Sequence, residues 1–301
     1  MLSRAVTTRP IHILHPRLLS TSTPPNASVD SLVGTAPTHN VYIFLHSQHR
    51  PKDFPAALPS PLRSALQLRA REWRGLVNFA WNPAYPNPYD FIHRTATGGG
   101  EVCSATAFVT GRHSNSRLDI PSVSIDNVDS VAEKVKQHVV ASLSSLEPDP
   151  PRPVLEGQDW IQADDTVYLY VCTHGAKDCR CGDWGGQVAD ALRTEVWKRG
   201  LEGAGLGKRV VVSEVGHVGG HKYAANLLVY PFGDWYYIRL GNVRTEDVPT
   251  ILDTILARPH RHRQSNERDV HPPLCLPHWR GRMGLLADEQ VSLYKSHAQN
   301  S

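Results

Sequence analysis

The segment TVYLYVCTHGAKDCRCG, residues 166–182, joins the pattern of a buried strand to a cluster of metal-binding side chains. Its first six residues are mostly apolar or aromatic, which predicts a short strand. Cys172, Cys179 and Cys181 follow, and residues 187–198 carry apolar side chains at helical spacing. In open α/β sheets, sites form where a strand gives way to a helix, and a helix N-terminus favours negative sulfur ligands. The segment therefore predicts an α/β fold with a site at this transition.

The predicted elements around this segment follow the order β-α-β-β-β-α. Strands are expected at 166–171, 209–215, 226–230 and 235–240, and helices at 187–198 and 245–256. Thr245 is expected to cap the second helix. This order, within about 90 residues, is the one that a thioredoxin-like α/β layer fold requires.

The first part of the chain predicts the same kind of fold. Strands are expected at 41–45, 75–80, 89–95 and 102–110, and helices at 61–71 and 128–146. A segment with four prolines follows and predicts a stiff linker. The expected organisation is a terminal segment at 1–34, a thioredoxin-like lobe at 35–146, the linker at 147–158, a second thioredoxin-like lobe at 159–258 and a basic, histidine-rich extension at 259–301. We expect the two lobes to share one architecture without a residue-level repeat.

Composition excludes several classes of protein. The chain has 301 residues, of which 40% are hydrophobic, and no run of about 18 apolar residues that would cross a membrane. A net charge of +3 is too small to favour nucleic acid as a partner. Five cysteines do not make a disulfide scaffold, whereas 16 histidines are a clear excess. No Ser-His-Asp order, phosphate-binding loop or dinucleotide fingerprint is present.

The first 29 residues have the composition of a mitochondrial transit peptide. They contain three arginines, no acidic residue and a run of hydroxyl side chains at 20–23. Pro10 and Pro16 weaken an amphipathic helix, so a disordered tail is the alternative. We therefore expect residues 1–34 to be a transit peptide or disordered, and the protein to reside in the mitochondrial matrix.

A second motif, GHVGGH at residues 216–221, follows the next predicted strand. Gly219 and Gly220 favour a tight loop over a helix, and such a loop can aim both imidazoles at one atom. Thiolates and imidazoles are ligands suited to zinc or to iron–sulfur clusters. The strands before the two motifs would lie close together in this fold, which favours a shared metal site over buried thiols and loop histidines.

These motifs resemble those of the sucrase/ferredoxin-like family of thioredoxin-like ferredoxins. The resemblance rests on Cys172-x8-Cys181, on the HVGGH motif with the KYA that follows it, and on WRGRMGL at 279–285. Within the family, the chain is most similar to the fungal altered inheritance of mitochondria branch. The resemblance covers residues 160–290 well and the first half only in topology, and it identifies 159–258 as a thioredoxin-like ferredoxin domain.

The resemblance implies a [2Fe–2S] cluster with Cys172 and Cys181 on one iron and His217 and His221 on the other. Two neutral imidazoles in place of two thiolates raise the reduction potential to about −150 to +300 mV. An imidazole can also lose the proton of its second nitrogen, so electron uptake can be coupled to proton uptake. The expected function is one-electron transfer or redox sensing, with redox partner proteins and the iron–sulfur assembly machinery as partners.

Several neighbours of these four residues are candidates for supporting roles. Cys179 departs from the family pattern and is an alternate ligand or a resolving thiol for Cys181. The residues that flank the ligands are expected either to donate hydrogen bonds to the site or to lie in solvent; they are His174, Lys177, Arg180 and Lys222. Trp184 and Trp235 are expected in the core, and Cys103 and Cys275 are expected to be ordinary thiols.

Three other uses of these residues stay open. The same four side chains suit a structural Cys₂His₂ zinc site, which would be silent in redox chemistry. Cys179 and Cys181 suit a metal-free thiol–disulfide protein, although no C-x-x-C is present. The segments C-x-H at 172–174 and C-x2-H at 275–278 mimic the halves of a Rieske site, but they lie about 100 residues apart in a setting that is not all-β. The histidines His260, His262, His271 and His278 are expected in a solvated basic loop.

Overall fold

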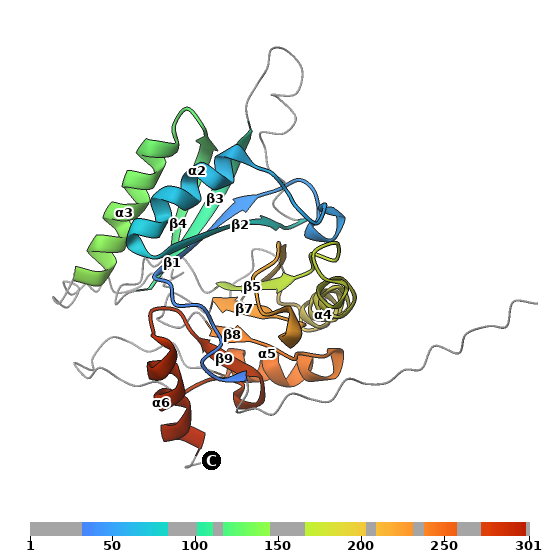
Figure 1. Cartoon of the computed structure of the whole chain (residues 1–301). Helices are drawn as coiled ribbons and strands as arrows, with labels where there is room; N and C mark the ends of the chain where they lie inside the picture. Colours follow the sequence, from blue (N-terminus) through green and yellow to red (C-terminus); the bar gives the residue numbers. More distant parts are fainter. Residues whose placement is uncertain are drawn as a thin grey trace, which may run out of the picture.

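The computed structural model describes residues 32–83, 101–110, 117–144, 166–202, 209–230, 238–257 and 272–298. In these residues the chain forms one nine-stranded mixed sheet and five α-helices (Figure 1), which confirms the predicted α/β class. No helix in these segments is long and apolar enough to cross a membrane. The segment before residue 32, the linker at 147–158 and the strand expected at 89–95 lie outside the described residues.

The first half contains β1 (Val41–His46), α2 (Pro61–Ala70), β2 (Gly75–Trp81), β3 (Val102–Val109), β4 (Arg117–Ser124) and α3 (Val128–Ser144). β1 pairs parallel with β2 and antiparallel with β3, which pairs antiparallel with β4. The sequence did not predict β4, because this strand mixes exposed and buried side chains and contains Pro121. Proline is tolerated there because β4 is an edge strand of the sheet.

The second half repeats this arrangement with β5 (Thr166–Cys172), α4 (Cys179–Lys198), β6 (Arg209–Val215), β7 (Leu227–Tyr230), β8 (Ile238–Leu240) and α5 (Val248–Leu256). β5 is parallel to β6 and antiparallel to β7, which is antiparallel to β8. β9 (Trp279–Arg282) extends the sheet beside β8, and α6 (Ala287–Ala298) follows it. The expected duplication is therefore present in strand order and direction, and the C-terminal segment adds an edge strand and a helix to the second half.

The two halves join edge to edge. The strand order is β4-β3-β1-β2-β6-β5-β7-β8-β9, and β2 pairs antiparallel with β6 through Ala80↔Val215 and Trp81↔Glu214. Each half buries an apolar core between its own helices and one face of its sheet. The junction therefore brings together the last residues of β2 and β6.

The helix-free faces of the two halves pack against each other. Phe44 of β1 stacks on Tyr170 of β5 with ring centroids 4.0 Å apart, and Phe108 of β3 stacks on Tyr230 of β7 at 4.2 Å. Since β2 and β6 separate β1 from β5 in the sheet, this contact requires the sheet to fold over at the junction, with the helices on the outside (Figure 1). Strands buried on both faces need apolar side chains at successive positions, which explains the continuous apolar runs of β1 and β5.

Helix α4 begins at Cys179 rather than at residue 187, where the sequence placed its start. Three glycines in its first turns hide the helical pattern, because glycine has a low helix propensity. Gly185 is required by close packing, since a Cβ there would lie 2.0 Å from the carbonyl oxygen of Cys172. The side chain of Asp178 caps the helix. The first turns of α4 therefore lie directly against the end of β5.

The entry to α5 also differs from the expected one. Thr245 does not cap the helix but lies in a 3-10 turn, Thr245–Asp247, that leads into it. The Asp247 carboxylate accepts a hydrogen bond from the Arg244 N–H at 2.7 Å, so a side chain other than that of Thr245 satisfies a backbone donor at this turn. The helix ends at Leu256, as predicted.

Candidate metal centre

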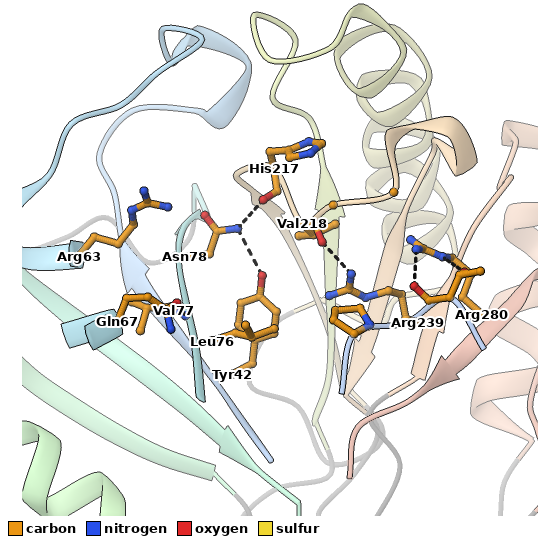
Figure 2. Close-up of a pocket in the computed structure, with 14 residues that line it drawn as sticks. Tyr42, Arg63, Gln67, Leu76, Val77, Asn78, His217, Val218, Arg239 and Arg280 are labelled. Carbon is orange, nitrogen blue, oxygen red and sulfur yellow. Dashed lines mark hydrogen bonds between the residues drawn. The ribbon is translucent and has the colours of Figure 1, made fainter. Parts of the chain in front are cut away.

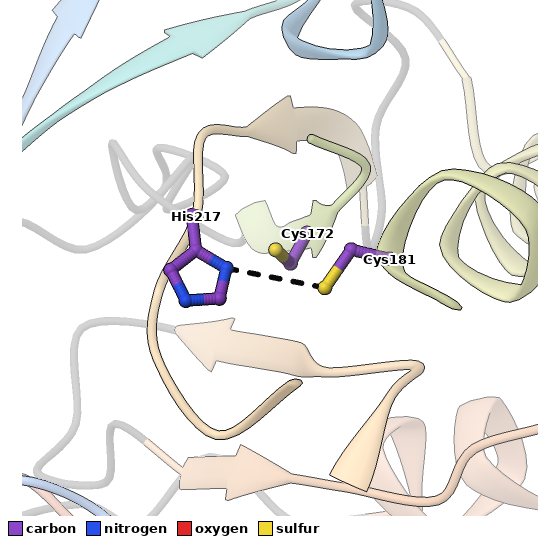
Figure 3. Close-up of side chains that lie close together, drawn as sticks. All are labelled: Cys172, Cys181 and His217. Carbon is purple, nitrogen blue, oxygen red and sulfur yellow. Dashed lines mark hydrogen bonds between the residues drawn. The ribbon is translucent and has the colours of Figure 1, made fainter. Parts of the chain in front are cut away.

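Three of the four predicted ligands lie together at one end of the second half. Cys172 is the last residue of β5, Cys181 lies in the first turn of α4, and His217 lies in the loop that follows β6. One ligand atom from each of the three lies within 4.8 Å of the others (Figure 3). Among the described residues, this is the one such group of histidine, cysteine and acidic side chains. It occupies the strand-to-helix transition that the sequence indicated.

The two cysteines of this group are buried, and the histidine lies on its outer side. Cys172 and Cys181 are each 1% exposed, whereas His217 is partly exposed. The Sγ of Cys181 lies 4.0 Å from Nδ1 of His217. Two buried sulfurs beside an imidazole form a donor set suited to zinc or to an iron–sulfur cluster.

The two thiols differ in acidity because they share a hydrogen bond. The Cys181 thiol donates to Cys172 and holds the pKa of Cys172 well below its usual value, although burial opposes the shift. Hydrogen bonds from His217 and from the Val218 N–H act in the same direction. The shared hydrogen bond and burial raise the pKa of Cys181. Binding a metal through both sulfurs would require both thiols to lose their protons.

His221, the fourth predicted ligand, lies at the rim of this group. It begins a 3-10 turn, His221–Tyr223, and its side chain is 50% exposed. Its ring centroid lies 5.5 Å from that of His217, with an angle of 31° between the ring planes. Its Nε2 lies 3.9 Å from Oδ2 of Asp178. His221 is thus a neighbour of the three-residue group without belonging to it.

The loop between the two histidines is tight, as the sequence predicted. Gly219 and Gly220 have φ angles of 81° and 70°, in the left-handed region that glycine adopts without strain. A Cβ at Gly220 would also lie 2.4 Å from Nη2 of Arg280. Both the backbone conformation and the approach of Arg280 therefore require glycine at this position.

Two residues that the sequence analysis missed fix the histidine loop. Asn78 of β2 donates hydrogen bonds to the carbonyl oxygens of Gly216 and His217, both at 3.2 Å. Arg239 of β8 donates to the carbonyl oxygen of Val218 at 2.7 Å (Figure 2). A lone asparagine within the apolar strand GLVNFAW is the only local sign of the first residue. No local pattern marks the arginine.

The flanking cations point to partners outside the group. Arg180 forms an ion pair with Asp178 at 2.9 Å. The Nζ of Lys222 lies 4.7 Å from the ring centroid of Tyr223. Lys177 is exposed. The contacts of Arg180 and Lys222 thus lie with their neighbours in the chain.

The Rieske-like segments do not come together in the described part of the chain. The Nε2 of His174 donates a hydrogen bond to the carbonyl oxygen of Pro55 at 2.9 Å, so this side chain contacts the first half. The Nδ1 of His278 forms a hydrogen bond with the carbonyl oxygen of Gly241 at 3.2 Å. Neither histidine joins the group around Cys172.

The remaining thiols lie apart from the site. Cys179 is exposed, whereas Cys181, two residues later, is buried beside Cys172. Cys103 is buried in the core of the first half, and Cys275 is partly buried against the core of the second. The structure thus places Cys181, rather than Cys179, next to the other ligands.

One of the two tryptophans expected in the core packs against it. Trp184 is partly buried against two of the apolar cores, with the Arg244 guanidinium 4.2 Å from its ring centroid. Trp235 and the histidines at 260, 262 and 271 lie outside the described residues.

Comparison with known proteins gives one family. A sucrase/ferredoxin-like family profile matches residues 32–276. Actin patches distal protein 1 of Saccharomyces cerevisiae is 30% identical over 97 residues, which cover 31% of this chain and 31% of that protein. Altered inheritance of mitochondria protein 32 is 35% identical over 91 residues in Meyerozyma guilliermondii, covering 29% of each chain, and 30% identical over 79 residues in Candida glabrata, covering 23% of each. The matches thus span less than one third of these relatives, and no solved structure matches the chain.

Proposed function

The chain belongs to the sucrase/ferredoxin-like family, and from that membership we propose that it binds a [2Fe–2S] cluster and acts as a one-electron carrier or redox sensor. The observation that carries the proposal is the convergence of Cys172, Cys181 and His217 within 4.8 Å. These residues come from two separate motifs, and their donors are the types that iron–sulfur clusters use.

The four candidate ligands fall into two pairs. Cys172 and Cys181 would hold one iron from the buried side, and His217 and His221 would hold the other from the exposed side. When bound, such a cluster supplies one-electron chemistry, at about −150 to +300 mV where two histidines replace two cysteines. The burial of the cysteines keeps water from the sulfurs, and the exposure of the histidines leaves their second nitrogens in reach of solvent protons.

The chain's own residues would position and neutralise this centre. Asn78 and Arg239 hold the backbone of the loop that carries His217. The Oδ2 of Asp178 lies 3.9 Å from Nε2 of His221 and brings negative charge to the exposed edge of the centre. Electron uptake would then be coupled to proton uptake at the exposed histidines, so the reduction potential should fall as the pH rises.

The location and partners form part of the same proposal. Relatives named for altered inheritance of mitochondria favour a mitochondrial association. We place the protein in the mitochondrial matrix, with a transit peptide in residues 1–34. The iron–sulfur assembly machinery would supply the cluster, and redox proteins would exchange electrons with it.

Anaerobic purification followed by metal and sulfide analysis tests the cluster. Iron and acid-labile sulfide in equal amounts, with visible absorption and a paramagnetic signal after dithionite reduction, is the expected result. Stoichiometric zinc in a colourless protein would overturn the proposal in favour of a structural Cys₂His₂ site. A colourless protein without metal would overturn it in favour of thiol chemistry at Cys179 and Cys181.

A further inference from the structure

A pocket of about 440 Å³ lies beside the metal centre, between the two halves of the molecule (Figure 2). The first half lines it with Tyr42 of β1, Arg63 of α2 and Asn78 of β2. The second half lines it with the loop at 217–220 and with Arg239 of β8. Pockets of this volume are large enough to hold a small molecule.

The described walls of this pocket carry positive charge and no carboxylate. Arg63, Arg239 and Arg280 line it, and none of the described residues around it is acidic. Arg239 and Arg280 are only 3% and 2% exposed. Buried guanidinium groups are normally paired with carboxylates. Three arginines without a carboxylate make the pocket an attractive site for an anion.

Arg239 is the residue that points most directly to a ligand. Its Nη1 donates to the Val218 carbonyl and its guanidinium lies near the Tyr42 hydroxyl, but its Nε and Nη2 are buried and meet no partner in hydrogen-bond geometry. The Nε of Arg63 is also buried without a partner. Unsatisfied buried donors are rare because each one costs free energy. Arg280, in contrast, directs its donors to Thr35 and Asn226.

We propose that this pocket binds a small molecule through an oxyanion, a phosphate or carboxylate group, held by Arg63 and Arg239. The guanidinium fork matches the paired oxygens of either group. Leu76, Val77 and Val218 line the same pocket and offer apolar contact to the rest of the ligand. Burial lowers the pKa of Arg239, and a bound anion would offset this cost of burying the charge.

The oxyanion site is distinct from the proposed cluster site. It uses the two arginines, whereas the metal centre uses Cys172, Cys181 and His217. The two sites share the loop at 217–220, because Arg239 holds the carbonyl next to His217. An anion held by Arg239 would therefore tighten the loop that carries His217.

Titration of the full-length protein with inorganic phosphate and with acetate, at constant ionic strength, tests the proposal. Calorimetry and thermal unfolding should show saturable binding of at least one of the two anions. Arg63→Met and Arg239→Lys should weaken it about tenfold or more, because each removes a charge-assisted hydrogen bond or the guanidinium fork. Arg71→Met is the matched control: it removes an exposed arginine that follows α2 and does not line the pocket. It should bind like the unaltered protein.

The outcomes separate the possible sources of the effect. Binding of phosphate but not acetate assigns a phosphate ligand, and the reverse assigns a carboxylate. The absence of saturable binding for both anions overturns the proposal, as does an equal loss in Arg71→Met and Arg63→Met, which would indicate general charge screening. If Arg239→Lys does not fold, Arg63→Met decides alone, since Arg63 is partly exposed. Metal content measured on the same samples tests the cluster proposal separately from anion binding.

Discussion

The two halves of the sheet have the same strand order, but among the described residues the cluster of candidate ligands lies in the second half. Cys172 ends β5 and pairs with Val215, and His46 ends β1 and pairs with Ala80. Because Ala80 and Val215 pair with each other at the junction, His46 occupies the place that corresponds to Cys172. Its two ring nitrogens form hydrogen bonds with hydroxyl groups of β3, at 3.0 and 3.1 Å. The side chain at the corresponding position of the first half is thus hydrogen-bonded within that half.

The first half contributes support instead of ligands. Asn78 fixes the histidine loop, and Pro55 accepts a hydrogen bond from His174 in the segment that joins Cys172 to α4. Arg50 forms an ion pair with Glu214 across the junction at 2.6 Å. In this duplicated fold, one half therefore carries the candidate ligand atoms, and the other holds the segments that present them.

Removing a cysteine of the second half should have the largest effect. Cys181→Ala should abolish metal binding, because it deletes one of the two sulfur donors of the three-residue group. Cys103→Ala is the matched control, since Cys103 is also buried but lies in the core of the first half. Elemental analysis of both purified variants makes the measurement. Equal loss of metal in the two variants would contradict the prediction, because the loss would then result from weakened folding and not from a missing ligand.

The next effect concerns the junction. Glu214 is fully buried and accepts hydrogen bonds from Arg50 at 2.6 Å, Arg193 at 2.8 Å and Thr173 at 2.9 Å. Glu214→Gln should lower the free energy of unfolding by about 2–3 kcal/mol. This loss is smaller than that expected when a fully buried ion pair is broken, because both arginines are partly exposed. Glu133→Gln, in a surface pair on α3, should cost about 0.5 kcal/mol or less. Urea unfolding of the two variants makes the comparison. A similar loss of free energy of unfolding in both would mean that the ion pairs of Glu214 do not hold the halves together.

The same carboxylate predicts a loss of stability in acid. Burial raises the pKa of Glu214, but hydrogen bonds from Arg50 and Arg193 outweigh it and hold the pKa below its ordinary value of 4.5. Such a group stabilises the fold at neutral pH, and the contribution is lost as the pH falls below 4.5 through the folded value. The stabilities of the unaltered protein and of Glu214→Gln should therefore converge in acid. A difference that stays constant with pH would rule out this carboxylate as the source.

Local sequence patterns predicted the parts of the fold that depend on neighbouring residues. β6 has the predicted bounds, Arg209–Val215, because its valines mark a buried strand. The C-x8-C and HVGGH motifs likewise indicated three residues that meet in the structure. The first turns of α4 escaped prediction because close packing requires glycine at position 185, where helix propensity favours other residues.

Contacts between the halves were not predictable in this way. Asn78 and His217 lie 139 residues apart, and Arg50 and Glu214 lie 164 residues apart. Neither pair forms a local pattern, because its geometry depends on the folding over of the whole sheet. The support that the first half gives to the site is therefore visible only in the structure.

A smaller effect is expected at Asn78. Asn78→Ala leaves the carbonyls of Gly216 and His217 without this donor and should lower the free energy of unfolding by about 1–2 kcal/mol. The freed loop should also release metal to a chelator faster. Asn127→Ala is the matched control, because its hydrogen bonds lie within the first half, before α3. Equal release rates in the two variants would show that Asn78 does not hold the histidine loop.

The smallest effect is expected at His46, the position that corresponds to Cys172. The ring is partly exposed, so water can replace it at the two hydroxyl groups, and His46→Ala should cost about 1 kcal/mol or less. Burial lowers the pKa of His46 below 6.5, so its contribution is present above that pH and is lost as the pH falls through the folded value. Metal content should be unchanged. The metal content of this variant should be measured beside that of Cys172→Ala. Loss of metal from His46→Ala would contradict the proposed division of roles, because the end of β1 in the first half would then be needed for the candidate ligands of the second half.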